Sequence, residues 1–356
     1  MGRRQFGLWP GVMCPRACDP ASAPVGDSGT VRFSAAVLAA VLLAGCGSGA
    51  GGGQTSDPAA HAPAAVTATP DPTPASATDV ATPDATAAPD ERTELPGGGR
   101  TLFPGRRLVA LYGHPGAPSL GVLGEQPVAE AVARAGRVAR SYDRLSTVPV
   151  VPAFELIATV AQRSAGADGD YSGESTVAEL RPWVRAAARH GMYVVLDVQP
   201  GRADVLDQVK RYRSLLLEPH VGLAVDPEWK LARGQKPLGQ IGSIGAAEIN
   251  RTTAWLAGLT RSNDLPQKLF VVHQFRLSML RNTDRLRTDR PEVALLVHMD
   301  GLGSPSQKDA TWDAVKHARP DGVPLGWKNF YDEDTRLFTP GQVMAKRPRP
   351  VMISYQ

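Results

Sequence analysis

The stretch Val221-Gly-Leu-Ala-Val-Asp-Pro-Glu-Trp229 is the most informative segment of this chain. It begins as an apolar strand and ends in two carboxylates, Asp226 and Glu228. Residues two apart in an extended chain point to the same face, so we expect the two carboxylates to converge on one spot. The small residues Gly222 and Ala224 share that face, while branched side chains occupy the other. This pattern is typical of a barrel strand that is wrapped by helices.

Apolar strands alternate with amphipathic segments from residue 106 onward. Eight segments have the pattern of strands: Leu108–Tyr112, Val148–Phe154, Tyr193–Val198, Val221–Val225, Leu269–His273, Val293–His298, Val323–Trp327 and Val351–Tyr355. Helical patterns lie between them: Val128–Tyr142, Thr176–His190, Ala203–Leu217, Ala246–Arg261, Phe275–Arg287, Lys308–His317 and, more weakly, Asp332–Lys346. Such alternation implies a parallel sheet, and eight units in about 250 residues predict a (β/α)8 TIM-like barrel.

The rival fold is an open, doubly wound sheet. That fold usually carries a Gly-rich phosphate turn after its first strand, whereas the turn here, Gly113–Pro118, lacks the required spacing. The chain ends directly after the eighth predicted strand. We therefore expect either that residues near 95–105 cover the groove of the missing last helix, or that the barrel is atypical there.

Residues 1–46 predict an N-terminal extension and a lipoprotein signal peptide. The apolar run within Val31–Cys46 is too short to span a bilayer comfortably, and it ends in small residues. Its last four residues, Leu43-Ala44-Gly45-Cys46, resemble a bacterial lipobox. The resemblance implies lipidation of Cys46 and an extracytoplasmic protein that a lipid anchors to the cell membrane.

Composition divides the rest of the chain in two. Residues 47–99 are rich in Gly, Ala, Pro and Thr and lack the apolar mass of a core, so they predict a disordered linker before a barrel domain at 100–356. The net charge of +4 is mild and the arginines are scattered, which argues against a nucleic-acid partner. No cysteine follows Cys46, which excludes a disulfide or a thiolate metal site in the barrel. We expect a monomer without a cofactor.

Polar side chains follow every predicted strand. Barrels of this class carry their catalytic side chains at the carboxyl ends of the strands. The candidates in chain order are Tyr112, His114, Glu155, Asp197, Gln199, Asp226, Glu228, Trp229, His273, Gln274, His298, Asp300, Lys328, Asn329 and Tyr355. Any one of them fits a purely structural role, but polar residues at all eight strand ends together predict a functional site.

Several carboxylates, several amides and nearby indoles are typical of a sugar-binding site. Carboxylate pairs perform acid/base chemistry in glycoside hydrolysis, and aromatic faces and amides bind sugar rings and hydroxyls. We therefore predict a glycoside-hydrolase-like enzyme acting on a cell-wall or environmental glycan. Its catalytic candidates are Glu228, Asp226, Asp197 and Asp300, and the remaining strand-end residues, with Trp327 nearby, would bind substrate.

The D-x-E sequence formed by Asp226 and Glu228 resembles the corresponding strand of the chitinase-like (family 18) glycoside hydrolases. This resemblance implies that Glu228 is the acid and that Asp226 steers the substrate's acetamide group. Apolar residues occupy the positions of the family's two earlier aspartates, so a simpler pair of Glu228 with Asp197 or Asp300 is an alternative. More loosely, the whole chain resembles actinobacterial lipoproteins with a barrel domain.

Two other functions fit the same residues. A metal-dependent hydrolase would use the strand-end histidines and carboxylates as ligands. Neither an H-x-H at the first strand nor the motifs of glycerophosphodiesterases occur, so we assign no metal. A non-catalytic barrel would hold a cell-wall glycan or a partner protein in the same cleft.

Overall fold

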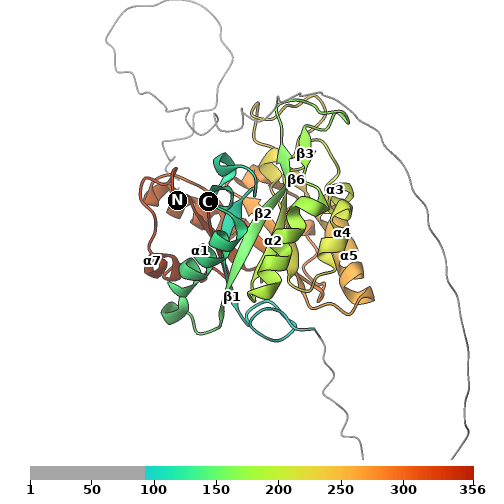
Figure 1. Cartoon of the computed structure of the whole chain (residues 1–356). Helices are drawn as coiled ribbons and strands as arrows, with labels where there is room; N and C mark the ends of the chain where they lie inside the picture. The colour runs from blue at the N-terminus through green and yellow to red at the C-terminus, as the bar shows by residue number, and fades with distance from the viewer. Residues whose placement is uncertain (1–92) are drawn as a thin grey trace, which may run out of the picture. The chain divides into compact units, whose positions relative to one another are not determined.

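Eight parallel strands form a closed barrel in the computed structural model, which describes residues 93–356 (Figure 1). They are β1 (Arg107–Gly113), β2 (Val150–Ala161), β4 (Tyr193–Val198), β5 (Val221–Val225), β7 (Lys268–Gln274), β9 (Val293–Met299), β10 (Leu325–Asn329) and β11 (Met352–Tyr355). Strand β1 pairs with both β2 and β11, so the sheet closes. The predicted fold class is confirmed. The predicted signal peptide and most of the predicted linker lie outside the described residues.

Helices cover the outside of the barrel. They are α1 (Val128–Arg140), α2 (Val177–Arg189), α3 (Val205–Arg211), α4 (Arg213–Leu216), α5 (Ala246–Ser262), α6 (Pro305–Ala318) and α7 (Pro340–Met344). Short 3-10 turns are η2 (Pro118–Leu120), η3 (Val122–Glu125), η4 (Asp143–Leu145), η5 (Pro227–Trp229), η6 (Leu277–Met279) and η7 (Thr283–Arg285). Strand β3 (Ser172–Glu174) pairs antiparallel with β2. No helix within residues 93–356 is long and apolar enough to cross a membrane.

The predicted helix at Phe275–Arg287 is wrong. This connection between β7 and β9 contains η6, the two-residue strand β8 (Leu280–Arg281) and η7. Strand β8 pairs in parallel with β6 (Ile244–Gly245), and Asn282 adopts a left-handed φ of 56° that a helix does not contain. Burial of Met279 and Leu280 in a tertiary contact thus outweighed the local helical pattern.

Inward-facing residues near the amino ends of the strands form an apolar layer. We call this set the lower layer: Leu108, Ala110, Val151, Ala153, Tyr193, Val195, Ala224, Leu269, Val271, Leu296 and Met352. The alternate residues Val221, Leu223 and Val225 belong to the outer core, which packs against the helices. A Cβ on Gly222 would lie 2.8 Å from the Tyr193 hydroxyl, so only glycine admits this tyrosine. The small-in, branched-out pattern of this strand is therefore confirmed.

The segment that precedes β1 closes the amino end of the barrel. Leu95 and Leu102 are buried in the same cluster as the lower layer. The amide of Leu102 donates to Gln267 Oε1 at 2.9 Å, which ties the segment to the start of β7. This segment lies below β1 in Figure 1. It plugs the barrel end, which differs from the first of the two expected alternatives, that it covers the groove of the missing last helix.

Candidate active site

One inward-facing polar side chain from each strand, or from the residue directly after it, forms a second layer toward the carboxyl end. We call this set the upper layer: Tyr112, Glu155, Asp197, Asp226, His273, His298, Lys328 and Ser354. Every member is buried. Alternation along parallel strands of one barrel places these side chains together although the sequence separates them widely.

The imidazole of His273 is the centre of the upper layer. Its Nε2 lies 3.1 Å from Glu155 Oε1 and 4.0 Å from Asp197 Oδ1, and its Nδ1 lies 3.2 Å from Asp300 Oδ2. Burial alone lowers a histidine pKa, but these carboxylates raise the pKa of His273 well above its ordinary value. The residue is therefore an imidazolium at neutral pH.

The charge of His273 keeps two of its neighbours ionised. Burial raises the pKa of Glu155 and of Asp300, but the hydrogen bonds and charge of His273 outweigh burial, so both pKa values lie below the ordinary ones. Asp300 Oδ1 is buried without a hydrogen-bond partner among the described residues. One oxygen of Asp300 is therefore held by the imidazolium, and the other is available to accept.

Three other carboxyl groups hold protons more tightly. Burial and then the charge of Glu228 raise the pKa of Asp226 well above its ordinary value. Burial also raises the pKa of Asp197, with Glu155 adding to the shift and His273 opposing it. Burial and the neighbouring Asp300 raise the pKa of Glu228 to about 7. Unlike the upper layer, Glu228 is only half-buried, because it lies in η5 beyond the strand end.

The second histidine is neutral. His298 stacks on His273 with ring centroids 5.3 Å apart, and its Nε2 lies 3.0 Å from Ser354 Oγ. Burial, with the charges of His273 and Lys328, lowers the pKa of His298 to about 3. A Cβ on Gly326 would lie 3.0 Å from this ring, so glycine makes room for the imidazole inside the barrel.

A lysine and a tyrosine complete the layer. Lys328 Nζ lies 3.4 Å from the centroid of the Tyr112 ring, and the Tyr112 hydroxyl donates to Asp197 Oδ2 at 2.8 Å. The ammonium lowers the pKa of Glu155 and Asp300 by its charge. Lys328 thus offsets part of the negative charge of the upper layer.

Most of the predicted site residues lie in or beside this network, but five do not face into it. Gln274, Asn329 and Tyr355 follow inward-facing residues by one position, so they point toward the helices. Their hydrogen bonds confirm this placement: Gln274 Nε2 donates to the Arg276 carbonyl, Trp327 Nε1 donates to Asn329 Oδ1, and the Tyr355 hydroxyl bonds the Tyr142 hydroxyl. Trp327 itself is fully buried.

The other two hold backbone segments at the rim. His114 is half-buried in the loop after β1, with Nε2 3.0 Å from Ser175 Oγ. Gln199 accepts the amide of Ala161 at 2.9 Å, which secures the end of β2. Trp229 is half-buried in η5, next to Glu228. Sequence reasoning missed Ser354, although the strand alternation that selects Met352 as inward-facing also selects it.

Donor atoms that could hold a metal ion come together elsewhere. Within residues 93–356, one group of three or more His, Cys, Asp or Glu residues has its donor atoms within 4.8 Å of one another. It consists of Asp168, Asp170 and Glu174, at the connection between β2 and β3. In the upper layer the imidazole and carboxylates instead pair with each other.

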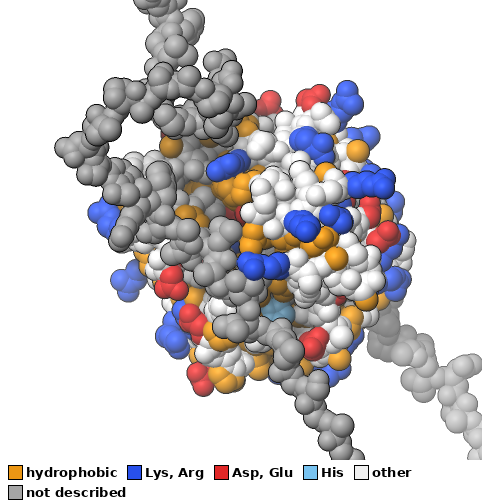
Figure 2. Space-filling view, turned by 90° about the horizontal axis from the view of Figure 1, so that it is seen from above, with side chains coloured by type: hydrophobic (Ala, Val, Ile, Leu, Met, Phe, Trp, Pro, Cys, Tyr) orange, Lys and Arg blue, Asp and Glu red, His pale blue; other side chains and the backbone are white. Residues whose placement is uncertain are grey.

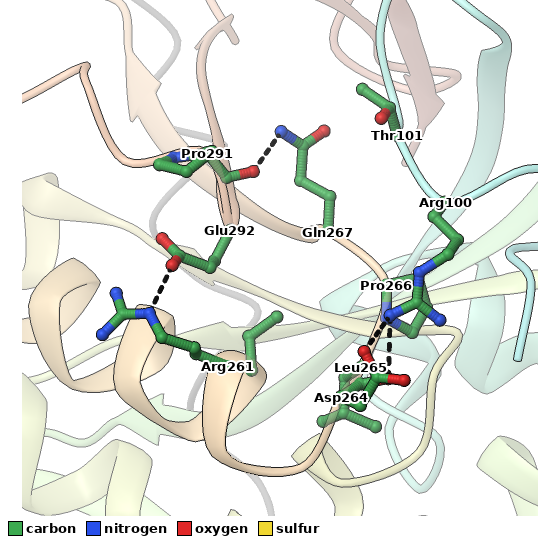
Figure 3. Close-up of a pocket in the computed structure, with 10 residues that line it drawn as sticks. Arg100, Thr101, Arg261, Asp264, Leu265, Pro266, Gln267, Pro291 and Glu292 are labelled. Atoms are coloured by element: carbon green, nitrogen blue, oxygen red, sulfur yellow. Dashed lines mark hydrogen bonds and ion pairs between the residues drawn. The ribbon is translucent and has the colours of Figure 1, made fainter. Parts of the chain in front are cut away.

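Two surface cavities lie at the amino end of the barrel, away from the upper layer. The first, of ≈ 290 Å³, is lined by Arg100, Asp264, Arg261 and Glu292 among others (Figure 3). Its charged groups pair with each other: Arg100 lies 2.8 Å from Asp264, and Arg261 lies 2.6 Å from Glu292. The second, of ≈ 560 Å³, lies beside the plug and is largely apolar. One oxygen in the first cavity, Glu292 Oε2, is buried without a hydrogen-bond partner among the described residues.

No protein-family model and no curated protein matches this chain. Several solved structures resemble it weakly. An oxaloacetate acetylhydrolase bound to 3,3-difluorooxalacetate is 14% identical over 70% of this chain and 74% of that chain, with a TM-score of 0.41. The N-terminal domain of a protein from Bacteroides vulgatus assigned as an aldolase is 11% identical over 70% and 72%, with a TM-score of 0.35. A Bacteroides thetaiotaomicron protein assigned as an alpha-L-fucosidase is 9% identical over 77% and 91%, with a TM-score of 0.36.

Proposed function

We propose that the upper layer, with Asp300 and Glu228, forms the active site of a hydrolase that cleaves glycosidic bonds. The observation that carries this proposal is a pair of neighbouring carboxyl groups whose pKa values shift in opposite directions. The pKa of Glu228 rises to about 7, whereas that of Asp300 falls below its ordinary value. Paired groups of this kind perform acid and base roles at one pH.

In the proposed reaction, Glu228 donates its proton to the glycosidic oxygen as the bond to the anomeric carbon breaks. Asp300 acts on the opposite side of that carbon, either as the nucleophile or as the base that takes a proton from the attacking water. The His273 imidazolium fixes one Asp300 oxygen at 3.2 Å and leaves the other free to react. His273 is therefore a positioning residue.

The remaining upper-layer groups suit the recognition of a polyol. Glu155 Oε2 and Asp197 Oδ1 are buried acceptors without a partner among the described residues. Sugar hydroxyls are donors that would satisfy them, which removes the cost of a buried unpaired acceptor. Trp229 is half-buried and follows Glu228 in η5, and an indole at such a position is a residue type that packs on sugar rings. Because the Leu43–Cys46 sequence predicts an extracytoplasmic lipoprotein, we propose a cell-envelope glycan as substrate.

The test is hydrolysis of isolated cell-wall glycan and of a panel of 4-methylumbelliferyl glycosides by the full chain. Glu228→Gln should lower kcat/KM by about 10³-fold or more, because the amide cannot donate the proton. Glu130→Gln, at an exposed position on α1, is the matched control and should leave the rate unchanged. Glycan binding without turnover by the unaltered chain would contradict a hydrolase and support a non-catalytic binding barrel.

A further inference from the structure

Exposed aliphatic side chains gather at one part of the barrel's carboxyl end. Four large apolar residues are exposed within residues 93–356, and three of them follow neighbouring strands. Ile241 is 39% exposed after β5, Leu277 is 49% exposed after β7, and Leu302 is 41% exposed after β9. The fourth, Leu145, lies in η4, before β2, at the opposite end of the barrel.

Strand pairing brings these three loops together. Strand β7 pairs with both β5 and β9, and β6 pairs with β8 in the register Ile244 to Leu280. Ile241 lies three residues before Ile244, and Leu277 lies three residues before Leu280, so each is close along the chain to one member of this pair. Helix α6, which begins three residues after Leu302, contacts η6, which contains Leu277. The aliphatic side chains therefore belong to one surface.

The three segments that carry these side chains are basic. The segments 229–247, 275–283 and 301–307 contain no Asp or Glu. They contain the exposed residues Arg233, Lys236, Arg276 and Arg281. We call these three segments the basic rim. Figure 2 shows this end of the molecule, with Lys and Arg side chains among apolar ones.

Four acidic residues directly flank these segments: Glu228, Glu248, Asp284 and Asp300, of which Asp284 is exposed. Further acidic groups of this end lie on other loops. Asp168, Asp170 and Glu174 follow β2, and Asp332 and Glu333 follow β10. The half-buried Lys230 is not part of the free positive charge, because it pairs with Glu248 at 2.8 Å. Positive charge therefore predominates within the basic rim itself.

Aliphatic residues interleaved with Arg and Lys match the chemistry of a lipid headgroup interface. Aliphatic side chains enter the boundary between headgroups and acyl chains, while the cations remain at the phosphate level. Each basic residue near an anionic leaflet strengthens the binding by its attraction to the headgroups. A soluble anionic polymer would account for the arginines and lysines, but it would leave the three aliphatic side chains in water. The combination favours a bilayer.

We propose that the basic rim binds the surface of a bilayer that contains anionic lipids. This contact turns the mouth of the upper layer toward the membrane, where it reaches substrates presented at that surface. The contact does not depend on the reaction, so it stands or fails separately from the proposed hydrolase activity.

The experiment measures binding of the full chain to phosphatidylcholine vesicles with and without phosphatidylglycerol, by co-sedimentation. Lys236→Glu with Arg276→Glu should weaken the phosphatidylglycerol-dependent binding about tenfold or more. Ile241→Ser with Leu277→Ser and Leu302→Ser should weaken it as well. The apolar run at Val31–Cys46 is present in every variant, so its contribution cancels in the comparison.

The matched control is Arg144→Glu with Leu145→Ser, which makes the same kinds of change in η4. It should bind as the unaltered chain does. Equal binding by the rim variants and this control would overturn the proposal. A second result would also overturn it. In that result, free dextran sulfate binds the unaltered chain as tightly as the vesicles do, and the triple serine variant binds the polymer and the vesicles as well as the unaltered chain. A binding site for a soluble anionic polymer would then explain the positive charge.

Discussion

The two layers inside the barrel are built by the same strands but are opposite in chemistry. The lower layer is apolar and is sealed by Leu102, which is fully buried. The upper layer buries two histidines, a lysine and three carboxyl groups. Apolar burial stabilises a fold, whereas burial of charge costs free energy that pairing only partly offsets. The comparison indicates that the lower layer supplies stability and that the upper layer is retained for chemistry.

The largest expected effect concerns activity and comes from Asp300, which lies against His273 of the upper layer. Asp300→Asn should lower kcat/KM by about 10³-fold or more, because an amide neither attacks the anomeric carbon nor takes a proton from water. The variant also removes one carboxylate partner of the buried His273 imidazolium, so unfolding by denaturant should show a loss of stability, and kcat/KM is compared where the variant is folded. Asp321→Asn, at an exposed position, is the control and should keep full activity. An active Asp300→Asn variant would remove Asp300 from the proposed mechanism.

The next effect separates the layers by stability. Leu102→Ala should lower the free energy of unfolding by about 2–5 kcal/mol, because it leaves a cavity in the plug of the lower layer. The value of kcat/KM should stay near that of the unaltered chain at temperatures where the variant is folded. Leu145→Ala, at an exposed leucine, should change stability by less than about 0.5 kcal/mol. Equal losses from both variants would show that the plug contributes little.

A third prediction concerns a charge outside both layers. Lys268 is fully buried at the start of β7, where its ammonium donates to the Glu218 carbonyl, and burial lowers its pKa to about 7. Between pH 7 and the ordinary lysine value of 10.5, the unfolded chain binds more protons than the folded one. Stability should therefore rise with pH in this window, by up to about 1.4 kcal/mol per pH unit.

Chemical denaturation measured between pH 7 and 10.5 tests whether the free energy of unfolding rises with pH. Lys268→Met should abolish the rise and should be more stable than the unaltered chain near pH 7. Lys210→Met, at an exposed position on α3, should keep the rise. If the stability of Lys268→Met still rises with pH, other titrating groups cause the rise.

The smallest expected effect is the pH dependence of the proposed reaction. Glu228 must be protonated to act as an acid, so kcat/KM should fall as pH rises through about 7, by about tenfold per unit. Asp300 must be ionised, and its lowered pKa places the acid limb below the ordinary range of an aspartate. Asp300 raises the pKa of Glu228, so Asp300→Asn should move the alkaline limb of any residual activity to lower pH. An unmoved limb would show that Glu228 and Asp300 are not coupled.

Strand positions were predictable because each strand is a short apolar run that contrasts with its connections. All eight predicted strands overlap observed ones, including Val221–Val225 and Tyr193–Val198 with identical bounds. The absence of a helix at Phe275–Arg287 was not predictable, because β8 in this segment pairs with β6, and the paired residues Ile244 and Leu280 are 36 positions apart. Local pattern contains no information about such a partner.

The location of the site was predictable from the sequence, but the full set of residues that form it was not. Naming the strand ends was sufficient to identify Glu155, Asp197, His273 and Lys328, which the barrel brings together. The error was in which strand-end side chains face the barrel interior. Side chains alternate along a strand, so a prediction one position too far named Tyr355, which faces the helices, in place of Ser354, which faces inward.

The sequence by itself determined the strands, the alternation that makes one face small and the other branched, and the end of the strands at which polar groups collect. These properties follow from local residue order, since period and turn residues act over a few positions. Only the tertiary structure decided that His273 lies between Glu155 and Asp300 and that the pKa of Glu228 rises to about 7. Those outcomes depend on distances across a closed barrel and on the exclusion of water, which no local pattern specifies.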